Sequence, residues 1–169
     1  RITVDSAPGR GSTFTVTLPL DASVQPASGP ASGRLPAGLP PLRLLLVEDN
    51  LDAAETLREL LEHLGHQVVV ANAGPEALAL AASSLPEVVL CDLGLPGMDG
   101  FEVARRLRLE PATAAAHLVA LSGYGREADR QRSTEAGFDA HITKPLQPDA
   151  LEALLRAAVE RRLASGKPG

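Results

Sequence analysis

The sequence is poor in cysteine and in aromatic residues, and it has no long uninterrupted apolar run. Because Cys91 is the only cysteine, no internal disulfide can form, and nothing points to secretion. No apolar stretch approaches the ~18 residues that a transmembrane helix needs, and the start carries no charged-then-apolar signal peptide. Hydrophobic residues make up 44% of the 169 residues and aromatic residues only 2%, so we expect a core of leucine, valine and alanine.

Positive charge is also scarce, because the formal net charge is -5 and the pI is near 5.4. An acidic chain lacks the electrostatic attraction to phosphate backbones that supports nucleic-acid binding. We therefore expect no nucleic-acid partner, no membrane segment and a cytoplasmic location. The chain begins at Arg1 rather than at methionine, which indicates the tail of a longer protein.

The composition changes along the chain and divides it into four segments. Residues 1–20 alternate apolar and polar residues around a glycine-containing turn, which predicts two short strands. Residues 21–41 are rich in proline, alanine, serine and glycine, a composition typical of a flexible linker. Residues 42–163 have the texture of a folded domain, and residues 164–169 are a polar tail.

Within the folded domain, short apolar runs alternate with helix-forming stretches. The predicted strands are residues 42–47, 68–70, 88–90, 118–121 and 138–142. The predicted helices are residues 51–64, 75–82, 101–109, 127–136 and 148–163, with Asn50 as the cap of the first. This alternation predicts an α/β domain with a parallel sheet and helices on both faces. Periodicity alone does not choose between the common strand orders.

Polar residues follow the apolar runs at the point where four of the strands end. They are Glu48 and Asp49, Asp92, Ser122, and Lys144. Because the carboxyl ends of parallel strands converge on one crevice, these side chains should meet. Three carboxylates, a hydroxyl and an ammonium together suit a small hard cation and the making or breaking of a bond to phosphate.

Each of these residues also has a plainer structural interpretation. Glu48 and Asp49 could hold Mg2+, or one of them could stabilise the N-terminus of the following helix. Asp92 could attack phosphorus as a carboxylate nucleophile, or it could open a turn. Ser122 and Lys144 could contact a phosphoryl group, or they could be an ordinary turn residue and a surface lysine. Their joint occurrence, each at a strand end, favours the chemical roles.

Four segments carry a resemblance to a known family: Leu45–Asn50, Cys91–Gly100, Ala120–Gly125 and Lys144–Leu146. Through them, residues 42–163 resemble the receiver domain of bacterial two-component response regulators. The resemblance implies a flavodoxin-like, doubly wound, five-stranded parallel sheet of strand order 2-1-3-4-5. It also implies a phosphorelay function, with a histidine kinase or a histidine phosphotransfer domain as the partner.

The same resemblance assigns roles to the acidic residues. It implies that Asp92 accepts a phosphoryl group from a phosphohistidine. It implies that Mg2+ lies among Glu48, Asp49 and Asp92, with the backbone carbonyl of Gly94 completing the ligands that the protein supplies. Metal coordination would neutralise charge as the phosphoryl group arrives.

The resemblance further implies that Ser122 and Lys144 contact the phosphoryl group, and one nearby position departs from the family pattern. Receivers often carry tyrosine or phenylalanine three residues before the lysine as a rotameric switch, where this chain has His141. A histidine could still swing in and out, and it could titrate near neutral pH. Alternatively, His141 could simply lie half-buried on an edge strand.

Residues 7–20 resemble the last hairpin of a histidine-kinase ATPase domain. This indicates that the parent is a hybrid sensor histidine kinase and that the folded domain is its C-terminal receiver. Gly9-Arg10-Gly11 lacks the further glycine and the Lys-Ser/Thr pair of a phosphate loop, and no histidine has the acidic neighbour of a phosphohistidine motif. We therefore expect no ATP binding. A receiver assists its own phosphorylation and dephosphorylation, so the sequence leaves open whether this domain is an enzyme. The oligomeric state is also left open.

Three other hypotheses compete with a signalling receiver. A Mg2+-dependent phosphatase with Asp92 as the nucleophile would usually carry a second acid two residues later, where this chain has Gly94. A flavin-binding protein of similar topology would need a phosphate loop rich in serine, threonine and glycine after the first strand, where this chain has acids. The third is a receiver that no longer signals, although all the key residues are present.

Overall fold

Short apolar segments bounded by turns form five strands of one sheet. The computed structural model describes residues 2–7, 11–16, 39–123 and 127–164, and the chain divides into two compact units, Arg1–Ser32 and Gly33–Gly169. The strands of the larger unit are β3 (Arg43–Val47), β4 (Gln67–Ala71), β5 (Val88–Asp92), β6 (His117–Ser122) and β7 (Ala140–Thr143). Its helices are α1 (Leu51–His63), α2 (Gly74–Ser84), α3 (Gly100–Leu109), α4 (Glu127–Ala136) and α5 (Pro148–Ala164).

The strand order in this sheet is β4-β3-β5-β6-β7, and every neighbouring pair is parallel. Counted from β3, this is the order 2-1-3-4-5, so the expected flavodoxin-like topology is confirmed. The chain leaves β3 toward one edge of the sheet and then returns to the other side through β5. The topological switch point, where ligands bind in open α/β sheets, therefore lies at the carboxyl ends of β3 and β5.

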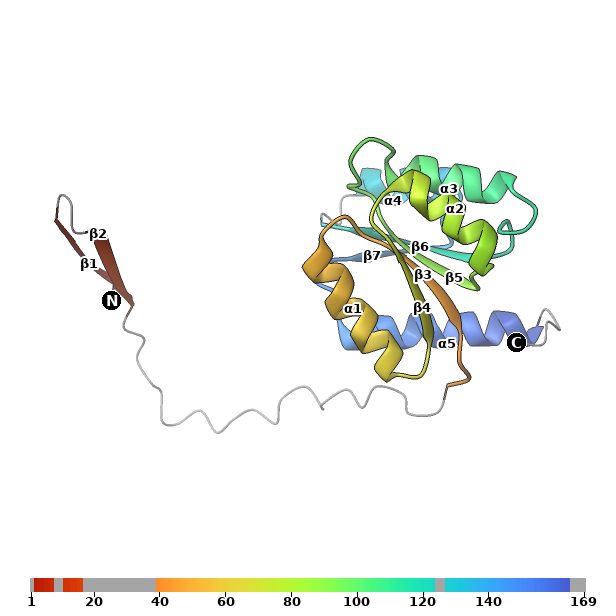
Figure 1. Ribbon diagram of the computed structural model, residues 1–169, viewed down its shortest axis with the longest axis horizontal. Helices are drawn as coiled ribbons and strands as arrows, with labels where there is room; N and C mark the ends of the chain where they lie inside the picture. Colours follow the sequence, from red (N-terminus) through yellow and green to blue (C-terminus); the bar gives the residue numbers. More distant parts are fainter. Residues whose placement is uncertain (1, 8–10, 17–38, 124–126, 165–169) are drawn as a thin grey trace. The chain divides into compact units, whose positions relative to one another are not determined.

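Successive residues of each strand face opposite sides of the sheet, and each side has its own apolar core. In β3, Leu44 and Leu46 pack with α1 and α5, whereas Leu45 and Val47 pack with α2 and α3. Figure 1 shows α1 and α5 covering one face of the sheet and α2, α3 and α4 covering the other. The buried residues are mostly leucine, valine and alanine, as predicted, with Phe101 among the few large aromatic additions.

The helix boundaries follow from local capping chemistry. The side-chain oxygen of Asn50 accepts a hydrogen bond from the backbone N–H of Ala53 at 3.0 Å, so the predicted cap of α1 is confirmed. Two helices end at glycines in the left-handed region, Gly65 with φ +90° and Gly137 with φ +100°. Glycine tolerates this conformation because it has no Cβ.

The last strand begins later than predicted. The sequence favours a strand over residues 138–142, but β7 spans Ala140–Thr143. The N–H of Phe138 donates to the carbonyl of Ser133 at 3.0 Å and so completes the last turn of α4 instead of joining the sheet. The apolar side chain of Phe138, which suggested a strand, is buried in the core under α3 and α4.

The smaller unit contains an antiparallel hairpin. Its strands are β1 (Ile2–Ala7) and β2 (Gly11–Val16), and their register pairs Ile2 with Val16. This agrees with the two strands predicted for residues 1–20. Most of the predicted linker, residues 21–41, lies outside the described residues, as does the tail from 165 onward.

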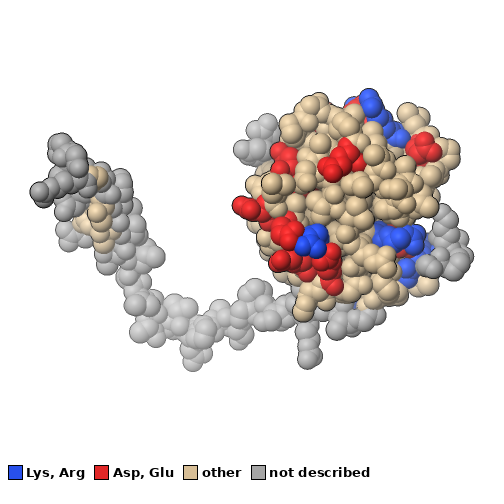
Figure 2. Space-filling view, viewed as in Figure 1, with Lys and Arg blue, Asp and Glu red and all other residues tan. Residues whose placement is uncertain are grey.

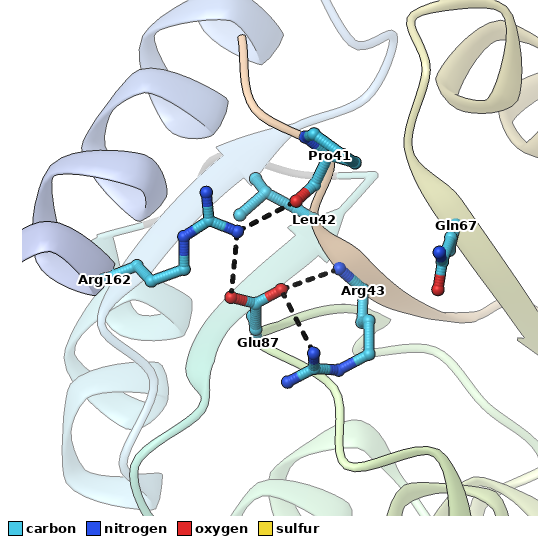
Figure 3. A pocket seen from close by; sticks show the side chains of 6 residues that line it. All are labelled: Pro41, Leu42, Arg43, Gln67, Glu87 and Arg162. Atoms are coloured by element: carbon cyan, nitrogen blue, oxygen red, sulfur yellow. Dashed lines mark hydrogen bonds and ion pairs between the residues drawn. The ribbon is translucent and has the colours of Figure 1, made fainter. Parts of the chain in front are cut away.

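The amino ends of the strands carry a polar cluster at the edge of the sheet opposite to the switch point. The Glu87 carboxylate accepts a hydrogen bond from the backbone N–H of Arg43 at 3.0 Å. The Arg162 guanidinium donates to the carbonyl of Pro41 at 2.9 Å and to the carboxylate of Glu87 at 3.4 Å. These groups border a cavity of about 230 Å³ (Figure 3). The contacts fasten the last turns of α5 to the start of β3.

The outer face of the larger unit includes an acidic surface over α1. Four residues of this helix are acidic, and Arg58 bonds to two of them, Glu55 at 2.9 Å and Glu62 at 2.7 Å. Figure 2 shows acidic side chains gathered over this helix. Such a surface repels phosphate backbones. In the part of the chain that the structure describes, none of the helices combines the length and hydrophobicity that a membrane span requires.

Buried histidines make the stability of this fold depend on pH. The Nδ1 atom of His66 accepts a hydrogen bond from the backbone N–H of Leu42 at 3.2 Å, and burial lowers the pKa of His66 below its usual value. The folded state therefore binds fewer protons than the unfolded state, so stability falls as the pH drops below about 6.5. We expect His66→Asn, which keeps an acceptor near the Nδ1 position but cannot titrate, to lose less stability on acidification than the wild type.

Urea unfolding at pH 7.5 and pH 5.5 measures this difference. The matched control is His63→Asn, which removes an exposed histidine from the end of α1. If His66→Asn and the wild type lose the same free energy of unfolding between the two pH values, the role of His66 is wrong.

Candidate functional site

The strand-end residues converge at the switch point of the sheet, as the sequence predicts. The parallel register places Val47 of β3 beside Cys91 of β5, and Asp92 of β5 beside Leu121 of β6. The residues that follow β3 and β7 extend from the same edge. Side chains that are distant in the sequence therefore lie together at one edge of the sheet.

Lys144 joins two of the acidic side chains. Its ammonium donates to Asp92 Oδ2 at 2.7 Å and to the carboxylate of Glu48. Burial alone would lower the pKa of Lys144, but its bonds to Asp92 and Glu48 prevail and raise the pKa above its usual value. The lysine is therefore held in its charged form, and it supplies a fixed positive charge beside Asp92.

The acidic cluster has more negative charge than this lysine balances. Carboxylate oxygens of Glu48, Asp49 and Asp92 lie within 4.8 Å of one another, at positions that range from buried to exposed. Within the described part of the chain, no side chain pairs with the exposed carboxylate of Asp49. Three carboxylates and one ammonium leave a net charge of about -2 when all are ionised. An oxygen-rich, partly open cluster with this charge fits Mg2+, which takes few protein carboxylates and retains water.

The Asp92 carboxylate is oriented by the loop that follows it. The backbone N–H of Gly94 donates to Asp92 Oδ1 at 2.9 Å, while Lys144 binds the other oxygen. The two oxygens of Asp92 thus have different partners. The role of the Gly94 carbonyl as a metal ligand stays a prediction.

Ser122 is buried at the end of β6 and contacts His141 on the neighbouring strand. Ser122 Oγ lies 2.8 Å from His141 Nε2, and Ser133 Oγ of α4 lies 3.0 Å from His141 Nδ1. Burial lowers the pKa of His141, Arg130 acts in the same direction, and Asp129 opposes them. His141 is half-buried, so this part of the plainer interpretation is correct, but both of its ring nitrogens have hydroxyl partners.

Asn72 supports the acidic cluster, although in the sequence it is marked only as a polar residue after a strand. Its side-chain amide donates to the carbonyl of Glu48 at 2.9 Å. Its own backbone N–H donates to the carboxylate of Glu76 in the first turn of α2 at 2.7 Å. The start of α2 therefore fixes the backbone that carries Glu48.

Gly100 supports the Asp92 loop through close backbone contact. A Cβ at this position would lie 2.3 Å from the Asp92 carbonyl oxygen and 2.9 Å from the Leu93 Cα. Asp99, just before it, caps α3 by accepting from the N–H of Glu102 at 2.8 Å. The loop after Asp92 thus ends in a tight junction that only a residue without a side chain can occupy.

Comparison with known proteins gives one family for this part of the chain. The response regulator receiver domain family matches residues 44–156. The chain is 34% identical to the virulence sensor protein BvgS of Bordetella bronchiseptica and 30% identical to the sensor protein EvgS of Escherichia coli. These similarities cover 92% and 89% of this chain but only 13% and 12% of the two sensors.

Solved structures agree with the family assignment. The receiver domain of a sensor histidine kinase from Pseudomonas aeruginosa is 26% identical, with a TM-score of 0.66, and the similarity covers 72% of this chain and 99% of that domain. That structure is described with a magnesium ion coordinated in its active site cleft. A putative response regulator from Chloroflexus aurantiacus is 31% identical, with a TM-score of 0.67, over 72% of this chain and 99% of that one.

The junction at Gly100 yields a stability prediction with a matched control. Gly100→Ala forces backbone atoms of the Asp92 loop to move, so we expect a loss of about 1–3 kcal/mol or more in the free energy of unfolding. Gly123→Ala is the control, because no atom of the described residues beyond its chain neighbours lies within 4 Å of the added Cβ, and it should stay within about 0.5 kcal/mol of the wild type. Equal losses in urea unfolding would contradict the proposed contact.

Proposed function

The chain belongs to the response regulator receiver domain family, and on that basis we propose that Asp92 accepts a phosphoryl group from a phosphohistidine. The observation that carries the proposal is the contact of Lys144 with both Asp92 and Glu48 beside the exposed carboxylate of Asp49. Together these residues offer a carboxylate nucleophile, a fixed cation and a cluster suited to a metal ion at one edge of the sheet. This combination suits phosphoryl transfer, in which charge must be neutralised as it gathers on the phosphoryl oxygens.

In the proposed step, one carboxylate oxygen of Asp92 forms a bond to phosphorus. The bond between phosphorus and the donor's imidazole nitrogen breaks, and that nitrogen keeps the electron pair. The donor imidazole leaves as a neutral ring when its other nitrogen carries a proton, so no charge is stranded. The ammonium of Lys144 stays beside Asp92 and binds a phosphoryl oxygen.

Glu48, Asp49 and Asp92, with the carbonyl of Gly94, would hold Mg2+, which supplies charge neutralisation at the transferring group. Asn72 keeps the backbone of Glu48 in place for this role. Ser122 would donate its hydroxyl proton to a phosphoryl oxygen.

We assign Ser122 and His141 as the switch pair. Their hydrogen bond joins the phosphoryl site to β7, and the bond from His141 to Ser133 continues to α4. Movement of Ser122 toward the phosphoryl group would therefore change contacts on the α4 face. A small free-energy difference between two such arrangements lets a local change in charge shift the population.

The parent protein is proposed to be a hybrid sensor histidine kinase in the cytoplasm, with a histidine kinase or histidine phosphotransfer domain as the partner. The similarity to BvgS and EvgS supports this because it extends beyond residues 44–156 to about nine tenths of the chain. In this proposal, residues 1–20 are the last hairpin of the kinase ATPase domain and residues 21–41 connect it to the receiver.

A phosphatase using Asp92 has less support. The position two residues after Asp92 is Gly94, which offers no side chain to protonate a leaving group. The similar proteins named above include two sensors and a putative response regulator. No observation at the site favours turnover of a phosphomonoester.

Phosphorylation by a small phosphodonor in the presence of Mg2+ tests the proposal. We expect an acid-stable, base-labile phosphoryl adduct on Asp92, located by mass spectrometry of peptides. Asp92→Asn should give no adduct, because an amide is not a nucleophile toward phosphorus. Asp52→Asn, which removes an exposed acid of α1, should be labelled like the wild type. A labelled Asp92→Asn protein, or steady hydrolysis of a generic phosphomonoester that requires Asp92, would contradict the receiver function.

Mg2+ affinity gives a second prediction. Asp49 has an exposed carboxylate without a partner in the described part of the chain and lies close to two other carboxylates, so Asp49→Asn should keep the unfolding free energy at or slightly above that of the wild type. Its Mg2+ affinity, measured by isothermal titration calorimetry, should nevertheless fall by about tenfold or more. Asp52→Asn again provides the control. Unchanged Mg2+ affinity in Asp49→Asn would remove Asp49 from the metal site.

A further inference from the structure

His141 connects the phosphoryl-contacting hydroxyl to helix α4 through both ring nitrogens. In the sheet, its Cα pairs with that of Ala120, two residues before Ser122. Nε2 faces Ser122 Oγ at 2.8 Å, and Nδ1 faces Ser133 Oγ at 3.0 Å. A phenylalanine at this position could make neither bond, so the histidine adds a hydrogen-bonding function to the place of the aromatic switch.

The bonds of Ser133 determine which nitrogen of His141 carries the proton. Ser133 Oγ lies 2.7 Å from the carbonyl oxygen of Asp129 and donates its hydroxyl proton to it. A hydroxyl has one proton, so Ser133 can only accept from His141, and Nδ1 must carry a hydrogen. In a neutral imidazole, Nε2 is then an acceptor, and the proton in its bond with Ser122 comes from the Ser122 hydroxyl.

The Ser122 hydroxyl has one proton, so it cannot donate to His141 Nε2 and to a phosphoryl oxygen at the same time. In the neutral state of His141, the Ser122 proton lies in the bond to Nε2. When Nε2 takes up a proton from solvent, the ring becomes an imidazolium and donates to Ser122 Oγ instead. The Ser122 proton can then be donated to a phosphoryl oxygen without loss of the bond to His141.

The surroundings of the ring keep both states accessible. From α4, Arg130 disfavours the charged ring and Asp129 favours it, while burial disfavours it. On β6, the neighbouring groups Ala120 and Ser122 are uncharged, and Lys144 follows β7 at the phosphoryl site. A cavity of about 220 Å³ lies beside His141 between α4 and β7 and gives water a route to the ring. An added phosphoryl dianion would favour the imidazolium.

We propose that His141 is a positioning residue whose protonation releases the Ser122 hydroxyl to the phosphoryl group, so that phosphorylation is coupled to proton uptake. This inference rests on the proposed function of Asp92 and deepens it. The phosphorylated state is favoured as the pH falls, because that state binds one more proton at His141.

NMR titration of the histidine rings in the full chain tests the coupling, with Mg2+ and beryllofluoride as the phosphoryl mimic. Without the mimic, nitrogen chemical shifts should report a neutral His141 with the proton on Nδ1. With the mimic, the proton affinity of His141 should rise about tenfold or more. His66 and His117, which lie next to the amino ends of β4 and β6, serve as internal references in the same samples. In Ser122→Ala, which cannot use the released proton, the rise should be several-fold smaller.

The outcomes separate this inference from the proposed function. If beryllofluoride binds at Asp92 while the proton affinity of His141 stays constant or falls, the coupling is wrong and the receiver function stands. If the ring carries its proton on Nε2 in the free protein, the hydrogen-bond assignment is wrong. If beryllofluoride does not bind, both the proposed function and the coupling fail. The formation of beryllofluoride itself depends on pH, and the wild type should show an additional pH dependence of affinity. The non-titrating variant His141→Gln should lack that additional pH dependence.

Discussion

The bond of one ammonium to two carboxylates is the contact on which the site depends. Lys144 follows β7 at the edge of the sheet, yet it reaches Asp92 at the end of β5 and Glu48 after β3. Without it, three carboxylates within 4.8 Å of one another would repel, two of them at buried or partly buried positions. With it, the cluster keeps enough excess negative charge to attract a divalent cation, and Asp92 keeps a cation beside its carboxylate.

The sheet makes this contact possible by topology rather than by local sequence. Five parallel strands end at one edge, and the chain reverses its direction across the sheet between β3 and β5, where ligands bind in open α/β sheets. The backbone around the acidic cluster is held by the first residues of the helices α2 and α3. Asn72 holds the Glu48 backbone from the start of α2, and Gly100 lets α3 begin against the Asp92 carbonyl. The acidic groups are thus held by backbone contacts on one side and by Lys144 on the other.

Much of this was predictable because apolar runs and their polar ends are local features. The strands, the Asn50 cap and the convergence of Asp92 with Lys144 follow from the alternation of elements and the geometry of parallel sheets. The start of β7 was not predictable, because the apolar Phe138 packs in the core while its backbone N–H bonds to α4 and not to a neighbouring strand. The roles of Asn72 and Gly100 depend on which backbone approaches them in three dimensions. Neither periodicity nor turn chemistry contains that information.

We propose above that the strand-end groups form one Mg2+-dependent site for a phosphoryl group. The most direct measurement is a beryllofluoride titration of the isotopically labelled chain, followed by amide NMR. We expect the resonances of residues 48–49, 92–94, 122–123 and 144 to shift together with a single apparent affinity. These shifts should vanish without Mg2+ and in Asp92→Asn. Shifts that persist without Mg2+, or that spare the residues after β3 and β7, would contradict it.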